Sequence, residues 1–137
     1  MMTRRTLLAM APAVITTCKS DSRYPIVGSG EFQYEMISDW GELPQGLAYG
    51  NTHGVCEDSQ GHIFVHHTVN KTSEKHDTMV VFDADGKFVT SWGAEFEGGA
   101  HGLHIHKEGR DEFLYLCDTK RALVVKTTLS EIGRAHV

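Results

Sequence analysis

The chain has 137 residues and a formal net charge of -5, from 13 Lys and Arg against 18 Asp and Glu. This balance argues against a nucleic-acid partner, because binding to phosphates needs a clustered basic surface and the cations here are scattered. The three cysteines, at positions 18, 56 and 117, form neither a paired disulfide framework nor a CxxC metal motif. We therefore expect one small domain of ordinary globular composition.

Residues 1–18 have the pattern of an export signal. Arg4 and Arg5 precede an uncharged apolar stretch that ends in small residues, and the run Thr-Arg-Arg-Thr-Leu-Leu resembles a bacterial twin-arginine (Tat) signal. Ile-Thr-Thr-Cys at positions 15–18 resembles a lipobox, where cleavage leaves a lipidated Cys18, although Thr17 departs from the usual Gly, Ala or Ser. Simple cleavage or a short N-terminal helix are the alternatives. We expect Tat export to the periplasm or the extracellular space, with membrane contact only through a lipid on Cys18.

Residues 19–29 are predicted to be a linker, and an internal repeat follows. His53-Gly54 and His101-Gly102 lie 48 residues apart, and each pair leads into a Gly-containing turn and then an apolar strand. In the first copy we expect strands at residues 63–65, 79–82 and 87–93. In the second copy we expect them at residues 113–116 and 122–125. The turn formers between them are Asp58, Gly61, Asp83, Asp85 and Gly86.

The segment upstream of the repeat adds one more strand. Residues 30–41 end in Trp-Gly, as do residues 87–93, so we expect them to be another copy of the fourth strand. Four antiparallel strands every 40 to 50 residues are typical of β-propeller blades. The fold class predicted for residues 30–130 is therefore all-β, with blades of four antiparallel strands.

The last residues of the chain, 131–137, have a sequence that indicates an origin outside the natural gene. Ile-Gly-Arg-Ala-His-Val at positions 132–137 is identical to the translated start of a widely used sequencing adapter, ATCGGAAGAGCACACGTC. We expect residues 131–137 to be an adapter translation and the natural protein to continue beyond about Ser130. An ordinary C-terminal tail is the alternative.

The repeat resembles the NHL-repeat family of six-bladed propellers over about residues 25–129. The resemblance rests on His-Gly-Val, Asp-x-x-Gly, Ile-Phe-Val, Val-Val-Phe-Asp-x-Asp-Gly-Lys-Phe and Trp-Gly. It implies that the chain contains about two of six blades. It departs from the family at His67, which stands where an Asp is usual; the second copy has Asp118 there. The connection between residues 68 and 78 is also longer than usual.

Eight of the nine histidines lie between His53 and His106, which raises the question of a metal site. Equivalent positions in consecutive blades would direct His53 and His101 toward the central channel. Neutral imidazole binds zinc, copper or iron. Propellers similar to peptidylglycine amidating lyase hold a catalytic zinc between histidines of separate blades, which implies His53 and His101 as ligands of zinc or another divalent metal. His67 is a weaker candidate, because adjacent strand residues face opposite sides and only one of His66 and His67 can join the site.

Two classes of function remain open. The first is a noncatalytic exported propeller with a histidine-lined channel, which binds a protein, peptide or glycan. The second is a metal-dependent enzyme of the amidating-lyase or lactonase type. Because the sequence contains no phosphate-binding loop, nucleophile elbow or paired-carboxylate motif, it assigns no catalytic residue.

Overall fold

The computed structural model describes residues 23–130 and 135–136, and apart from one short 3-10 helix its regular elements are strands. The predicted Tat signal and Cys18 lie outside the described residues, as do residues 131–134 and 137 of the predicted adapter segment. The chain divides into two units, residues 1–38 and 39–137. No helix among the described residues is long and apolar enough to cross a membrane.

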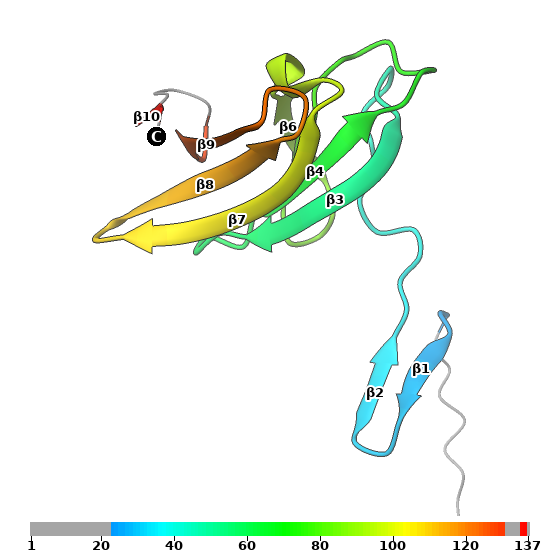
Figure 1. Cartoon of the computed structure of the whole chain (residues 1–137). Coiled ribbons are helices and arrows are strands. Elements are labelled where there is room, and N and C mark those ends of the chain that lie inside the picture. The colour runs from blue at the N-terminus through cyan, green and yellow to red at the C-terminus, as the bar shows by residue number, and fades with distance from the viewer. Residues whose placement is uncertain (1–22, 131–134, 137) are drawn as a thin grey trace, which may run out of the picture. The chain divides into compact units, whose positions relative to one another are not determined.

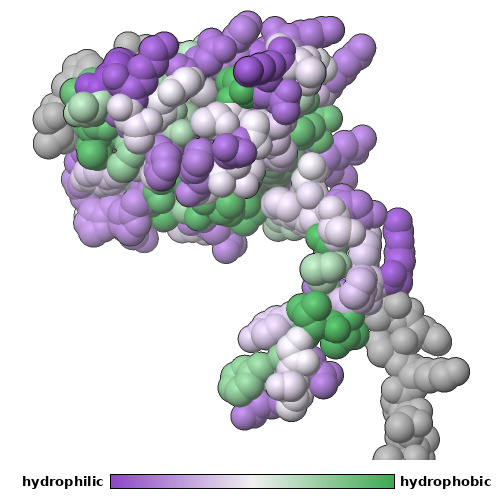
Figure 2. Space-filling view, turned by 45° about the vertical axis from the view of Figure 1, so that its right-hand side comes forward, coloured by the Kyte–Doolittle hydropathy of each residue, from purple (hydrophilic) through white to green (hydrophobic). Residues whose placement is uncertain are grey.

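The first unit contains a two-stranded hairpin. Strand β1 (Ile26–Ser29) pairs antiparallel with β2 (Phe32–Glu35), and Ser29 opposite Phe32 closes a two-residue loop. Gly30 in that loop has a φ of 60°, a conformation that two-residue hairpin turns require and that glycine adopts without strain. The hairpin presents exposed apolar side chains (Figure 2), among them Phe32 at 65% and Tyr34 at 64% exposure.

This hairpin differs from the expectation for the same residues. The segment predicted as a linker, residues 19–29, contains β1, and the single strand predicted over residues 30–41 is the short strand β2 followed by irregular chain. The physical reason is Gly30, which forms the turn between two strands and does not begin a single strand as predicted.

The second unit consists of two four-stranded antiparallel sheets (Figure 1). The first sheet contains β3 (Tyr49–Glu57), β4 (Ile63–Val69), β5 (Met79–Phe82) and β6 (Phe88–Trp92), in that order. The second sheet contains β7 (Ala100–Glu108), β8 (Asp111–Asp118), β9 (Leu123–Thr128) and β10 (Ala135–His136), also in chain order. The 3-10 helix η1 (Ala94–Phe96) connects the sheets.

The strand register confirms the internal repeat. In the first sheet Val65 lies between Val55 and Val80, and in the second Leu116 lies between Leu103 and Val125. Both first strands also carry a register shift at the His-Gly pair, between residues 52 and 54 in β3 and between 100 and 103 in β7. The first three strands of the two sheets are therefore two copies of one unit, whereas β10 in the fourth position belongs to the predicted adapter segment. The all-β prediction is confirmed for the described residues.

The predicted turn formers have the expected roles. The side chain of Asp58 accepts hydrogen bonds from the backbone N–H groups of Gln60 and His62, at 2.9 and 2.8 Å. Asp83 accepts equivalent bonds from Asp85 and Lys87, at 3.0 and 2.9 Å. These carboxylates replace backbone partners in the tight turns between strands and so fix the strand ends.

The sheets pack on each other through one shared apolar core. Phe64, Met79 and Val81 of the first sheet pack in one cluster with Leu114, Leu116 and Val125 of the second. The opposite face of the first sheet carries Val65, Val80 and Phe82, which Leu43, Leu47 and Tyr49 cover. In the repeat, Leu116 is the counterpart of Val65 and not of Phe64. The sheets therefore stack in the same orientation, the front of the first against the back of the second.

Candidate functional site

His53 and His101 meet where the two sheets lie side by side. His53 is in β3 and His101 in β7, the first strands of their sheets, which run next to each other in Figure 1. Their imidazole rings stack with centroids 4.3 Å apart and planes inclined by 19°. Both residues are exposed. The structure thus brings together the two histidines that the sequence repeat placed at equivalent positions.

Gly54 allows the two strands to approach this closely. A Cβ atom at Gly54 would lie 2.5 Å from Cβ and 2.9 Å from the backbone N of Leu103. Side-chain carbon atoms do not approach other atoms to this distance, so any larger residue would push β7 away from β3. The glycine that follows His53 is therefore part of what brings the two imidazoles into contact.

A third histidine, His66, lies beside this pair. It has no exposed surface, and its Nδ1–H donates a hydrogen bond of 3.2 Å to the backbone carbonyl oxygen of His101. The pKa of His66 is lowered from its ordinary 6.5 to about 4, mainly by burial and to a smaller extent by the neighbouring imidazoles of His67 and His53. Hydrogen bonds to the backbone of His101 and Gly102 act in the opposite direction without overcoming these effects. His66 is therefore a neutral imidazole at neutral pH.

His67 lies on the other face of the first sheet. Its Nδ1–H donates a hydrogen bond of 2.7 Å to the carbonyl oxygen of Thr68, and its ring meets that of Tyr49 edge-on at 4.7 Å. Burial lowers the pKa of His67 and raises that of Tyr49 to about 12. The alternation of strand side chains directs one of the two adjacent histidines toward the His53–His101 pair, and it is His66, not the predicted candidate His67, that contacts it.

The other histidines do not join the pair. His104 and His106 stack on each other along β7, with ring centroids 6.3 Å apart, as expected for residues on one face of a strand. His62 contacts Asp58 in a turn, and His76 contacts Glu97 between two connections. The residues described here contain no group of three or more His, Cys, Asp or Glu arranged to hold a metal ion.

The donor chemistry of the pair nevertheless fits a divalent transition metal in part. His53 and His101 are exposed imidazoles of the type that binds zinc, and their ring centroids lie 4.3 Å apart. Two ligands do not complete a catalytic zinc site, which needs three protein ligands and one open position.

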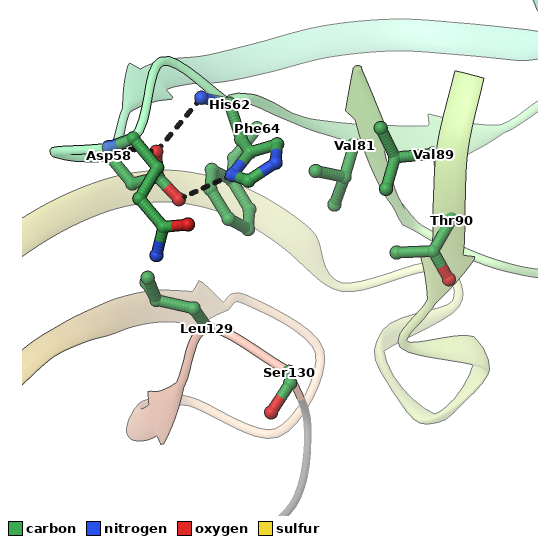
Figure 3. A pocket seen from close by; sticks show the side chains of 9 residues that line it. Asp58, His62, Phe64, Val81, Val89, Thr90, Leu129 and Ser130 are labelled. Atoms are coloured by element: carbon green, nitrogen blue, oxygen red, sulfur yellow. Dashed lines mark hydrogen bonds and ion pairs between the residues drawn. The ribbon is translucent and has the colours of Figure 1, made fainter. Parts of the chain in front are cut away.

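A cavity of about 240 Å³ lies elsewhere in the second unit (Figure 3). Apolar side chains form most of its wall, and Asp58 and His62 point toward each other at one end. Burial alone would raise the pKa of Asp58, but the donors of His62 and Gln60 outweigh it and hold this pKa below its ordinary value. The Asp58 carboxylate is thus occupied by its own turn. The lining residues are Asp58, Gln60, His62, Phe64, Val81, Val89, Thr90, Leu129 and Ser130.

Sequence reasoning missed His66 as a neighbour of the candidate pair. The period-two alternation separates His66 from His67, yet it does not show which of the two faces the second sheet. That information is in the core, where Phe64 on the same face as His66 packs against β8 and β9.

A comparison with family models, with curated proteins and with solved structures finds no match for this chain.

Proposed function

We propose that this chain is a binding module of the NHL-repeat propeller type, exported through the Tat pathway, whose ligand site is centred on His53 and His101. The repeated four-stranded sheets and their stacking in one orientation support the propeller assignment. The Arg4-Arg5 motif supports export. In such a propeller β3 and β7 are the innermost strands of adjacent blades, so the two histidines line the central channel.

The exposed, stacked imidazole pair is the observation that carries this proposal. Stacked aromatic rings offer a flat apolar face, and their ring nitrogens offer hydrogen bonds at its edge. That combination suits a peptide side chain, a protein loop or a glycan ring. His53 and His101 are held by close backbone packing at Gly54, so the surface is already formed before a ligand arrives.

Peptide and glycan arrays test the binding function. We expect ligands that give a signal with the wild-type chain and lose it when His53 and His101 are both replaced by Ala. The matched control replaces His104 and His106, a second exposed stacked pair on β7, and should keep the signal. Signals that are equal in all three proteins would contradict a site at His53 and His101.

The same pair favours a second candidate, a metal-dependent enzyme similar to the amidating lyase. Its support is the chemistry of two exposed imidazoles from neighbouring sheets, which are zinc ligands when neutral. The metal, when bound, would act as a Lewis acid or activate a water molecule. His53 and His101 would hold it, and the described residues offer no third ligand.

Calorimetric titration with Zn²⁺ separates the two candidates. A stoichiometric zinc site that is lost in the His53→Ala plus His101→Ala variant, and retained in the His104→Ala plus His106→Ala variant, would support the metal candidate. Equal zinc uptake by all three proteins, or none by the wild type, would remove it and leave the binding module.

A further inference from the structure

His66 connects the two sheets at the place where the candidate pair forms. It belongs to β4 of the first sheet, whereas the carbonyl oxygen that accepts its Nδ1–H, at 3.2 Å, belongs to His101 in β7 of the second. The His66 ring also lies edge-on to Phe96, with centroids 6.0 Å apart. One buried side chain therefore contacts both the connection between the sheets and the backbone of a candidate ligand-binding residue.

The strand ladder does not fix His101 in the regular way. The register of β7 with β8 runs from Ala100 opposite Asp118 directly to Leu103 opposite Leu116. His101 and Gly102 lie in the irregular step between these pairs. A residue in such a bulge lacks the regular ladder partner that would hold its backbone. The hydrogen bond from His66 supplies a partner at this point.

The chemistry of the His66 ring indicates that this hydrogen bond is its main polar role. Because a carbonyl accepts, Nδ1 carries the proton and Nε2 is the unprotonated nitrogen. Nε2 is buried and has no hydrogen-bond partner among the described residues. An apolar side chain would avoid this orphan nitrogen, and the repeat places Cys117, a residue without such a ring, at the equivalent position of β8. Nδ1–H is the one polar group of the ring that the fold uses.

We propose that His66 is the positioning residue of the site: its Nδ1–H holds the His101 backbone so that the imidazole of His101 stacks on that of His53. This proposal rests on the proposed function in one respect, which is that the His53–His101 pair binds a ligand. The stacking itself can be measured without any ligand.

Nuclear magnetic resonance of the histidine rings tests the proposal in the full chain. In the wild type, stacking should shift the ring protons of His53 and His101 upfield. His66→Leu removes the donor and should abolish that shift. His66→Asn places an amide N–H where Nδ1–H stands, and it should preserve the shift. His67→Leu is the matched control, since it removes an equally buried histidine that faces Tyr49, and it should leave the pair unchanged.

Several outcomes would overturn the proposal. The first is a folded His66→Leu variant in which the ring protons of His53 and His101 keep the upfield shift of the wild type. The second, which needs no variant, is an Nε2–H tautomer of His66 in the wild type, because that tautomer cannot donate to the His101 carbonyl. The third is loss of the stacking shift in both His66→Asn and His67→Leu, which would indicate a general packing defect.

A zinc titration gives a second readout. If the wild type binds zinc through the pair, His66→Leu should weaken that binding roughly 10- to 100-fold, the usual effect of losing a residue that orients a ligand, and His66→Asn should restore most of it. Unchanged affinity in His66→Leu would count against the positioning role. Absence of zinc binding by the wild type would count against the metal candidate alone, and the ring resonances would still decide the role of His66.

Discussion

The buried imidazole of His66 should make the metal-free protein less stable in acid. Burial lowers its pKa from 6.5 to about 4 in the folded chain, whereas the unfolded chain titrates near the ordinary value. Between these two pH values the unfolded state binds more protons than the folded state. The free energy of unfolding therefore falls as the pH falls through 6.5, and the loss is complete below about pH 4.

The size of this loss follows from the two pKa values. The gap between them is equivalent to about 3 kcal/mol below pH 4, and about 2 kcal/mol of this is already lost at pH 5. His67, whose pKa burial also lowers, acts in the same direction.

Urea unfolding at pH 7.5 and pH 5, with EDTA present, measures the effect. His66→Asn removes the titrating group and should reduce the difference between the two pH values by about 2 kcal/mol relative to wild type. His104→Asn, which removes an exposed imidazole, should leave the wild-type difference in place. An equal pH dependence in wild type and His66→Asn would show that protonation of His66 is not coupled to unfolding.

Three further predictions concern packing and export. Gly54→Ala should lower the free energy of unfolding by about 1–3 kcal/mol, because the added Cβ overlaps Leu103 between β3 and β7. It should also abolish the stacking shift of the His53 and His101 rings. A variant as stable as wild type would contradict this prediction. Met79→Ala should cost about 2–5 kcal/mol in urea unfolding, since Met79 has no exposed surface in the core shared by the sheets. Replacing Arg4 and Arg5 by Lys should leave unprocessed protein in the cytoplasm, which fractionation and immunoblotting would detect, and normal export would refute the Tat assignment.

The regular part of the fold could be predicted because its signals are local. Apolar runs bounded by Asp and Gly turns predict strands at residues 63–65, 79–82 and 113–116; the second has the bounds of β5, and the ends of the other two lie within four residues of those of β4 and β8. The 48-residue repeat then predicted that His53 and His101 are equivalent, and the matching register shifts confirm it. A repeated sequence forms the same local ladder twice.

The hairpin, the role of His66 and the stacking of the histidine pair could not be predicted from the sequence. They depend on contacts between distant segments or on the conformation of one glycine in a turn. The sequence predicts a single strand that begins at Gly30, whereas the positive φ of that glycine reverses the chain between β1 and β2. The role of His66 was missed because the sequence does not show which face of a sheet packs on the next. The stacking distance of the histidine pair depends on Gly54 against Leu103, a contact across two sheets.

The stacking of both sheets in the same orientation has a consequence for how the repeat tolerates change. Phe64 and Val81 face the second sheet and are 3% exposed, whereas their repeat counterparts Tyr115 and Lys126 are half-buried on the face of the second sheet that is turned away from the first, and Tyr115 donates its hydroxyl hydrogen to Glu108. Equivalent positions of the two copies therefore have different neighbours among the described residues. A polar side chain at Phe64 or Val81 would be buried in the apolar core between the sheets, where it costs free energy unless it is hydrogen-bonded, so the polar residues of the second copy cannot simply be transferred to the first.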